Sequence, residues 1–336
     1  MKVFGALNIL SKEDGIGMSD NNKSIYDATP FIYNRADPYV IKNGDVYYFT
    51  ATVPDYDCIV LRKSNTLCGL CDSEEKIIWK KHEAGEMSAN IWAPELHFLF
   101  GKWYIYFAAG RADNVFDIRP YVLECQGDDP YNDGWLEMGK MQACDEDDFS
   151  FKAFSLDATV FENKGKWYYV WAEKVGVGKQ ISNLYIAEMK SATKLESVQV
   201  MLSTPDYDWE RGEFWVDEAP SVIMNNSRIY MTFSASDTGI SYCIGMLCAD
   251  ADADLLDPAS WVKCRYPVLA SDEEIGIFGP GHNSFTKNEK GEDVLVYHAR
   301  FETEIEGDPL DNPNRHTCLM KFEFCEGGPK FNYKKK

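Results

Sequence analysis

The stretch LDATVFENKGKWYYVWAEK, residues 156–174, decides the fold. It contains two apolar runs of strand length, and both are rich in β-branched and aromatic residues, which strands favour. Asn163, Lys164 and Gly165 lie between the runs, and Asn and Gly are the residues that tight turns prefer. The stretch therefore predicts an antiparallel β-hairpin.

Four other segments repeat this order of strand, tight turn and aromatic strand. Tyr47, Tyr104, Tyr168 and Tyr230 mark the aromatic strands and are 57, 64 and 62 residues apart, and Leu295 follows after a further 65. The sequence therefore contains a repeat of about sixty residues. The four segments are ADPYVIKNGDVYYFTAT from Ala36, APELHFLFGKWYIYFAAG from Ala93, DEAPSVIMNNSRIYMTFSAS from Asp217 and GPGHNSFTKNEKGEDVLVYHAR from Gly279.

The repeat predicts an all-β fold, because short apolar runs bounded by Gly, Asn, Asp and Pro outnumber helical patterns. A unit of this length holds a four-stranded sheet, and such sheets bury both faces when they pack radially around an axis. We expect a five-bladed β-propeller that forms one domain over residues 1–336, with residues 1–30 closing the ring. The alternative is a β-sandwich with regularly spaced hairpins.

Composition and charge exclude several classes of partner. Of the 336 residues, 45% are hydrophobic and 14% aromatic, which is enough for a packed core. The 54 acidic and 34 basic residues give a net charge of −20, which repels nucleic acid and anionic membranes. No apolar run reaches the length of a membrane span. We therefore expect neither nucleic acid nor a membrane as a partner.

The N-terminus and the cysteines point to a cytoplasmic protein. The stretch MKVFGALNILSKEDGIG lacks the long apolar core and the cleavage site of a signal peptide. Ten cysteines are scattered along the chain, without the dense spacing of a disulfide scaffold. Cys68 and Cys71 have the spacing of half a zinc site, but no second pair completes it. We expect reduced thiols and no zinc.

Acidic residues open several of the repeats. Asp37, Asp157 and Glu218 stand near the starts of three units and His282 near the start of the fifth, at spacings of 120, 61 and 64 residues. In a propeller the first strands of all blades face one central channel, so these side chains should meet. Gathered carboxylates shift one another's pKa, which allows an ionised base and a protonated acid to coexist. Hydrolysis of a glycosidic bond needs such a pair.

Six ordered motifs resemble glycoside hydrolase family 43, over about residues 31 to 325. The resemblance implies a five-bladed propeller of inverting glycosidases that act on arabinofuranosides and xylosides. It also implies Asp37 as general base, Asp157 as the residue that modulates the acid's pKa and orients it, and Glu218 as general acid. The motifs are NRADPYV around Asp37, WAPELH around Glu95, SLDATVF around Asp157, WVDEAPSV around Glu218, GPGHNSF around His282 and YHAR around Arg300.

Within that family, YHARFETEIEGDPLDNPNRHT and IWAPELH look most like the α-L-arabinofuranosidase type. The resemblance thus implies an exo-acting enzyme that releases terminal α-L-arabinofuranosyl residues from arabinan- or arabinoxylan-derived oligosaccharides. The expected partner is an arabinose- or xylose-containing oligosaccharide, and no cofactor is required. The loops Asp113–Asp117 and Asp206–Glu213 are expected at the pocket rim, where they set linkage preference.

Three further residues are candidates for substrate binding. Trp92 can supply a stacking face for the sugar, or it can be a core residue. Arg300 can donate to sugar hydroxyls or pair with the acids, or it can form an ordinary salt bridge. His282 can bind substrate or lie near a central structural calcium ion, as the resemblance implies, although calcium prefers oxygen ligands. The role of Glu95 stays open.

Three alternative functions share the fold. The first is a β-xylosidase of the same family. The second is an inverting glycoside phosphorylase, which needs several cationic groups around phosphate. The third is a carbohydrate-binding propeller without catalysis, which would not need all three acids. The cationic groups available for the second are Arg300, His282, His298, Arg315 and His316.

Overall fold

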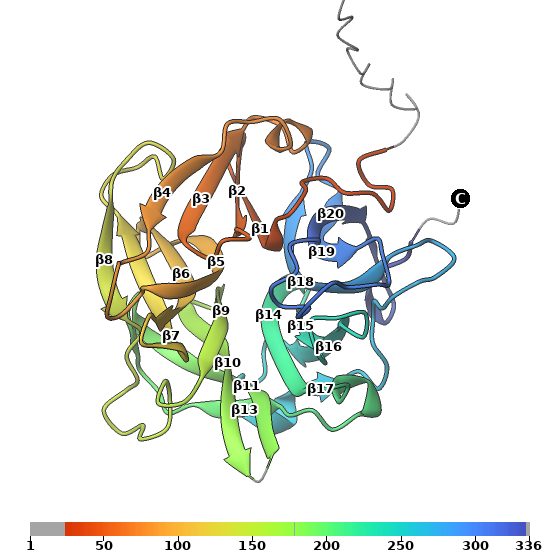
Figure 1. The fold of residues 1–336 in the computed structure, drawn as a ribbon. Helices are drawn as coiled ribbons and strands as arrows, with labels where there is room; N and C mark the ends of the chain where they lie inside the picture. The colour runs from red at the N-terminus through yellow and green to blue at the C-terminus, as the bar shows by residue number, and fades with distance from the viewer. Residues whose placement is uncertain (1–23, 178, 334–336) are drawn as a thin grey trace, which may run out of the picture.

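Strands dominate the computed structural model, which describes residues 24–177 and 179–333 (Figure 1). The all-β prediction is confirmed. In this part of the chain no helix is both long enough and apolar enough to span a bilayer. The helical turns are short 3₁₀ helices: η1 (Cys68–Leu70), η2 (Asp208–Glu210) and η3 (Pro258–Ser260).

The first two sheets are four-stranded, antiparallel and built in chain order. Each begins with the hairpin that the sequence predicts. The first contains β1 (Ala36–Asn43), β2 (Val46–Thr52), β3 (Cys58–Ser64) and β4 (Lys76–Lys80). The second contains β5 (Ala89–Leu99), β6 (Lys102–Arg111), β7 (Asn114–Cys125) and β8 (Trp135–Lys140).

The next two repeats are joined into one nine-stranded sheet. The join is a short parallel pairing of β11 with β14, at Ile181 with Trp215 and Ser182 with Val216. The third repeat contains β9 (Ser155–Asn163), β10 (Lys166–Val177), β11 (Lys179–Ser191), β12 (Lys194–Leu195) and β13 (Val200–Ser203). The fourth contains β14 (Trp215–Asn225), β15 (Arg228–Ala235), β16 (Cys243–Asp250) and β17 (Val262–Lys263).

The last sheet lies beside the start of the described chain. Ile32 pairs with Thr317, and Phe31 and Ile32 share a buried cluster with residues of the first and last sheets. Most of the segment expected to close the ring, residues 1–23, lies outside the described residues. The last sheet contains β18 (Phe278–Lys287), β19 (Asp293–Arg300) and β20 (His316–Lys321), and a separate hairpin follows with β21 (Glu323–Cys325) and β22 (Gly328–Lys330).

The first strand of each repeat lies nearest the centre of the molecule (Figure 1). Strand β1 contacts β5, β5 contacts β9, β9 contacts β14, β14 contacts β18, and β18 contacts β1. Apolar side chains fill the space between neighbouring sheets. One such cluster joins Ile59 and Leu61 of β3 to Ile105 of β6. The centre is therefore lined by first strands, and the apolar core surrounds it.

Each of these five central strands contains an irregular position in the described chain. The pairing register shifts there, as in a β-bulge, and a residue other than glycine adopts a left-handed backbone. Such a residue costs on the order of 1–3 kcal/mol and redirects the neighbouring side chains. The left-handed residues are Asp37 (φ 52°), Ala93 (φ 48°), Asp157 (φ 50°), Ala219 (φ 50°) and His282 (φ 43°).

Candidate functional site

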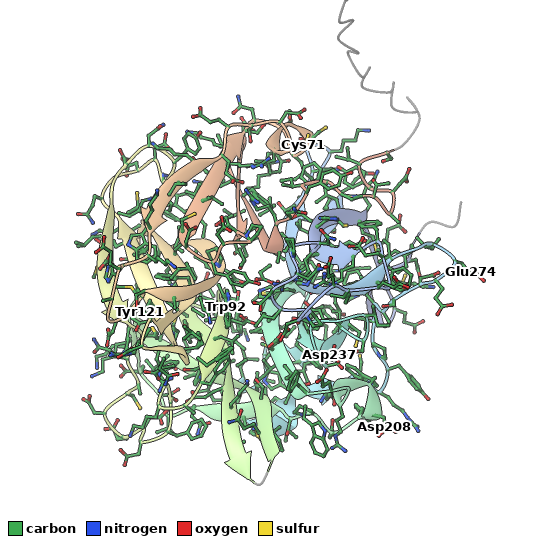
Figure 2. All side chains as sticks on the ribbon, viewed as in Figure 1. Cys71, Trp92, Tyr121, Asp208, Asp237 and Glu274 are labelled. Atoms are coloured by element: carbon green, nitrogen blue, oxygen red, sulfur yellow. The ribbon has the colours of Figure 1, made fainter. Side chains whose placement is uncertain are left out.

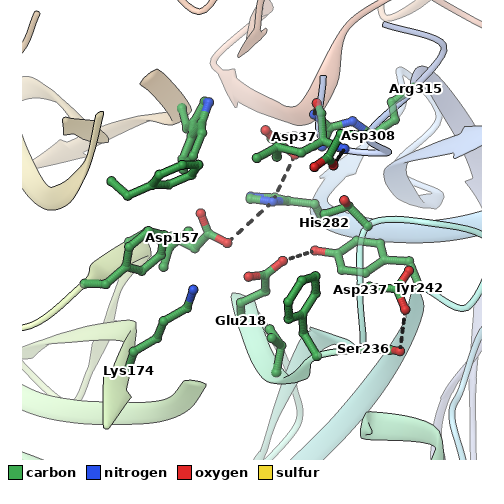
Figure 3. A pocket seen from close by; sticks show the side chains of 18 residues that line it. Asp37, Asp157, Lys174, Glu218, Ser236, Asp237, Tyr242, His282, Asp308 and Arg315 are labelled. Carbon is green, nitrogen blue, oxygen red and sulfur yellow. Dashed lines mark hydrogen bonds and ion pairs between the residues drawn. The ribbon is translucent and has the colours of Figure 1, made fainter. Parts of the chain in front are cut away.

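A pocket of about 250 Å³ opens at the centre of the molecule, beside the irregular positions of the central strands (Figure 3). Trp92 and Asp237 line the pocket and lie toward the middle of the molecule. Cys71 and Glu274 lie at the periphery of the molecule (Figure 2). Acidic, cationic and aromatic side chains meet here. Among them are Asp37, Asp157, Glu218, His282, Lys174 and Arg315.

The bulges explain why these side chains meet. Asp37, Asp157 and His282 are themselves the left-handed residues of β1, β9 and β18. Glu218 instead comes one residue before the left-handed Ala219 of β14, and Trp92 likewise precedes Ala93 of β5. The sequence analysis placed Glu218 at the same repeat position as the two aspartates. The structure shows an offset of one residue, because alanine occupies the equivalent position.

Asp37 is a carboxylate held between cationic groups. Its Oδ1 lies 3.2 Å from Nδ1 of His282 and 3.6 Å from Nη1 of Arg315. Its backbone N–H donates to Nδ1 of His298 at 3.1 Å. Burial alone would raise the pKa of Asp37, but the charge and hydrogen bond of His282, together with Arg315, hold it well below its usual range. Asp37 is therefore ionised at neutral pH.

His282 links two of the three acids. Its Nδ1 lies 3.2 Å from Oδ1 of Asp37 and 3.8 Å from Oδ2 of Asp157 (Figure 3). Burial favours the neutral ring, but the charges of both aspartates outweigh it and raise the pKa of His282 to about 9. A protonated imidazole therefore lies between the carboxyl groups at neutral pH.

Asp157 and Glu218 behave as a pair that retains a proton. Burial raises the pKa of both carboxyl groups, and the charge of Glu218 raises that of Asp157 further. Neighbouring carboxylates in one buried site do not ionise together easily. Tyr242 donates a hydrogen bond to Oε1 of Glu218 at 2.8 Å. The site therefore combines an ionised acid, Asp37, with a pair of acids that share one proton.

The three sequence-predicted binding residues have different positions. Trp92 and His282 line the pocket, and Trp92 packs edge-to-face on Tyr56 with ring centroids 5.7 Å apart. Arg300 does not line it. The guanidinium of Arg300 donates to Oδ1 of Asn312 and to the carbonyl of Pro309, both at 2.6 Å. Arg300 thus supports the loop whose Leu310 forms a pocket wall.

Glu95 also lies away from the pocket lining. Its Oε2 is 2.7 Å from Nε2 of His97, and Nδ1 of His97 is 3.2 Å from the hydroxyl of Tyr39. All three side chains belong to central strands, and those of Glu95 and His97 are buried. Glu95 therefore belongs to a polar network of the interior.

Several residues of the pocket lining were not predicted as substrate or acid contacts, among them Tyr242, Arg315, Lys174, Phe116 and Phe214. Two of them lie in or directly beside the loops that were predicted at the pocket rim. Phe116 lies inside the predicted rim loop Asp113–Asp117, and Phe214 directly follows Asp206–Glu213. Tyr242 and Lys174 carry no motif that points to the pocket, because they reach it through tertiary packing. Arg315 lies in the segment that resembles the arabinofuranosidase type, but nothing in the sequence distinguishes it there from Arg300.

The possible central calcium ion near His282 stays a prediction. Calcium takes six to eight oxygen ligands. The carboxyl oxygens of Asp37 and Asp157 lie 3.2 and 3.8 Å from Nδ1 of His282. Within residues 24–177 and 179–333, no group of three or more His, Cys, Asp or Glu side chains is placed to hold a metal ion.

A family model and the similar proteins of known name point to the same family. The model of glycosyl hydrolases family 43 matches residues 28–329. The chain is 44% identical over 311 residues to an extracellular exo-α-(1→5)-L-arabinofuranosidase of Streptomyces avermitilis, covering 92% of this chain and 63% of that protein. It is 43% identical to a protein of the same name from Streptomyces chartreusis, covering 92% and 93%. The chain thus spans less than two thirds of the S. avermitilis relative.

The predicted cytoplasmic location is wrong, because both of these relatives are named extracellular. The inference rested on the cysteines and the N-terminus. All ten cysteines are free, but a chain of this length buries enough surface to fold without disulfides, so free thiols do not identify the compartment. The stretch that was compared with signal peptides lies outside the described residues.

A solved structure supports the same assignment. The crystal structure of an α-L-arabinofuranosidase from Lactobacillus brevis superposes with a TM-score of 0.85 at 47% identity, covering 91% of this chain and 96% of that chain. The match of the family model over most of the chain and the identity to these relatives show that the chain belongs to glycosyl hydrolases family 43.

Proposed function

We propose that this protein is an inverting, exo-acting α-L-arabinofuranosidase that releases terminal arabinofuranosyl units from arabinan- or arabinoxylan-derived oligosaccharides. The observation that carries the proposal is the pairing of ionised Asp37 with the proton-retaining Asp157 and Glu218 in one pocket. The names of the relatives support the sugar, since those proteins are arabinofuranosidases at 43–47% identity.

Each acid has a defined part in the proposed reaction. Asp37 takes a proton from a water molecule while the oxygen of that water bonds to the anomeric carbon. The bond from that carbon to the leaving oxygen breaks, and Glu218 gives its proton to the leaving oxygen. Asp157 holds Glu218 in its protonated form. This scheme needs a gap of roughly 6.5–9.5 Å between the carboxyl groups of Asp37 and Glu218 for the water, and that separation is a prediction.

The size of the pocket supports exo action. Trp92 and Leu310 contribute to its walls, and the volume of about 250 Å³ suits a terminal sugar rather than a chain that passes through. Arg300 and Arg315 both bond to carbonyls of the loop that carries Leu310. That loop belongs to the segment whose sequence resembles the arabinofuranosidase type.

The site also bears on the phosphorylase alternative. Of the five cationic residues considered for phosphate, only His282 and Arg315 line the pocket among the described residues. Both already lie against Asp37. Phosphate would therefore approach three acids, with Lys174 as the remaining cation of the described pocket lining, and this excess of acids favours water as the nucleophile.

For the scaffold we propose a single-domain, five-bladed β-propeller. Five central strands contact one another in a closed order, and each has a left-handed residue at the same place in its repeat. The pairing of Ile32 with Thr317 adds the start of the described chain to the last sheet. This arrangement supports a ring in which every repeat forms one blade.

A panel of substrates tests the function. We expect hydrolysis of aryl α-L-arabinofuranosides and of α-1,5-arabinobiose, a rate independent of phosphate, and the β-anomer as the first sugar seen by proton NMR. Activity on aryl β-D-xylosides alone would assign the protein to the xylosidase alternative. A phosphate requirement or a retained anomer would refute the proposed reaction, and binding without turnover would favour the non-catalytic alternative.

A further inference from the structure

We propose that Phe116 and Phe214 form a binding subsite for the leaving sugar, with Lys174 as its polar contact. The ligand class is a glycosyl unit that presents an apolar face and hydroxyl groups. This inference rests on the proposed function, because the side of the pocket next to the acid is where the leaving group departs.

The course of β14 places Phe214 on the leaving-group side. Phe214, in the bend directly before β14, and Val216 and Glu218 within β14 all line the pocket, so this short segment forms one face of its lining. Because an extended chain spans at most roughly 3.6 Å per residue, Phe214 lies at most about 14 Å from the proposed acid along the chain. A sugar whose linking oxygen contacts Glu218 would extend along this face toward Phe214.

Phe116 and Phe214 are exposed although they are large and apolar. Their exposed fractions are 58% and 59%, and they reach the pocket from separate elements, β7 and the loop before β14. In the described chain neither ring has an aromatic neighbour, whereas exposed Phe98 and Phe100 pack against Trp103 and Trp167. Exposed aromatic rings at a pocket mouth suit the apolar face of a sugar.

Lys174 supplies polar contacts on the same side. Figure 3 shows it reaching from β10 toward Asp157 and Glu218. Its ammonium lies over the ring of Phe154, 3.9 Å from the centroid. Within the described residues this ammonium forms no salt bridge and no hydrogen bond, although the charge of Glu218 acts on it, and the backbone N–H of Lys174 donates to the carbonyl of Phe154 at 2.9 Å. The three N–H donors of the ammonium are therefore available to hydroxyls of a sugar bound between the phenylalanines.

The test compares two substrates that share the arabinofuranosyl unit and differ in the leaving group. Phe116→Ala, Phe214→Ala and the double variant are assayed on α-1,5-arabinobiose and on methyl α-L-arabinofuranoside, whose leaving group is too small to reach either ring. We expect kcat/KM on arabinobiose to fall about threefold to tenfold for each variant, while the methyl glycoside changes less than about twofold. Phe214→Tyr, which keeps a ring, should restore the rate on arabinobiose.

Phe100→Ala is the matched control, because Phe100 is 48% exposed and lies outside the pocket lining. It should leave both rates unchanged. Equal losses on both substrates, or no loss on arabinobiose, would overturn the subsite. If the unmodified protein cleaves neither arabinoside, the proposed function fails and the subsite fails with it. If the unmodified protein is active and the variants match it, only the subsite fails.

Discussion

The phenol of Tyr242 donates its hydrogen bond to Oε1 of Glu218, at 2.8 Å. In the neutral carboxyl of Glu218 the carbonyl oxygen is the better acceptor, so this bond favours Oε2 as the position of the proton. The ring of Tyr242 stacks on His298 with centroids 5.6 Å apart and planes 4° apart. Its hydroxyl also bonds to the side chain of Ser234, whose Oγ accepts the backbone N–H of His282 at 2.7 Å. Tyr242 therefore links the orientation of the proposed acid to the strand that carries His282.

Tyr242→Phe should slow turnover and broaden the pH range on its alkaline side. The hydrogen bond favours the ionised form of Glu218, so its loss raises the pKa of Glu218, and the alkaline limb of kcat/KM should move to higher pH. Turnover on arabinobiose should fall on the order of tenfold, because the proton is no longer confined to one oxygen.

Tyr47→Phe is the control for this variant, since Tyr47 is buried and donates to the carbonyl of Lys287, away from the pocket. It should leave the pH profile unchanged. A Tyr242→Phe enzyme that is slower, yet keeps its alkaline limb in place, would show that Tyr242 acts on packing alone.

Gly281→Ala should damage the same contact by steric means. A Cβ at this position would lie 2.1 Å from Cε1 of Tyr242, so the ring must move. We expect a loss of about 1–3 kcal/mol in the free energy of unfolding and a fall in kcat. Gly134→Ala, where a Cβ meets nothing within 4 Å, is the control. Urea unfolding and initial rates measure both effects, and wild-type values for Gly281→Ala would mean that the ring relaxes freely.

The sequence predicted the hairpins well because each is encoded locally. In the hairpin of β9 and β10, Asn163 pairs with Lys166 across the expected turn. The gathering of Asp37, Asp157, Glu218 and His282 was also predictable, because a repeat of sixty residues brings equivalent positions together.

Other features of the site could not be predicted, for physical reasons. The left-handed residue marks the repeat position at which the strands bend toward the pocket. In β5 and β14 this residue is alanine, whose side chain carries no functional group that could indicate a site. The partner of Asp37 is Arg315 rather than Arg300, and only the packing of the loop between them decides which guanidinium faces inward. The close approach of Gly281 in β18 to Tyr242, which directly precedes β16, likewise arises only in the fold.

Glu218→Ala should distinguish substrates by their leaving groups. Removal of the proposed acid should lower turnover on arabinobiose about 10²–10⁴-fold. A dinitrophenyl arabinofuranoside needs no protonation as it leaves, so its turnover should fall much less. Glu213→Gln, at an exposed position on the rim, is the control. Equal losses on both substrates would remove Glu218 from the role of acid.

His282→Asn should change how stability depends on pH. The variant keeps a residue that tolerates the left-handed backbone of this position. The folded-state pKa of His282 is raised from 6.5 to about 9, so its protonated form stabilises the fold fully below about pH 6.5, and this contribution is lost as the pH rises through 9. Wild type should therefore lose about 3 kcal/mol of unfolding free energy relative to the variant over this range. Parallel denaturation curves at every pH would contradict the shift.

Asp157→Asn tests which member of the carboxyl pair carries the proton. The substitution keeps the shape, and Asn also tolerates the left-handed backbone at φ 50°. Burial raises the pKa of both Asp157 and Glu218, that of Asp157 well above its usual range, and the charge of His282 opposes the rise at both groups. If Asp157 is the ionised member, as proposed, its charge helps to keep the proton on Glu218. Its removal then lowers the pKa of Glu218, and the alkaline limb of kcat/KM should move to lower pH. The acid limb depends mainly on Asp37 and should move less.

If Asp157 is instead the neutral member, Asn imitates it, and the alkaline limb stays in place even where the rate falls. A fixed alkaline limb in an impaired variant would therefore refute the electrostatic role of Asp157 and assign it to orienting the substrate or Glu218.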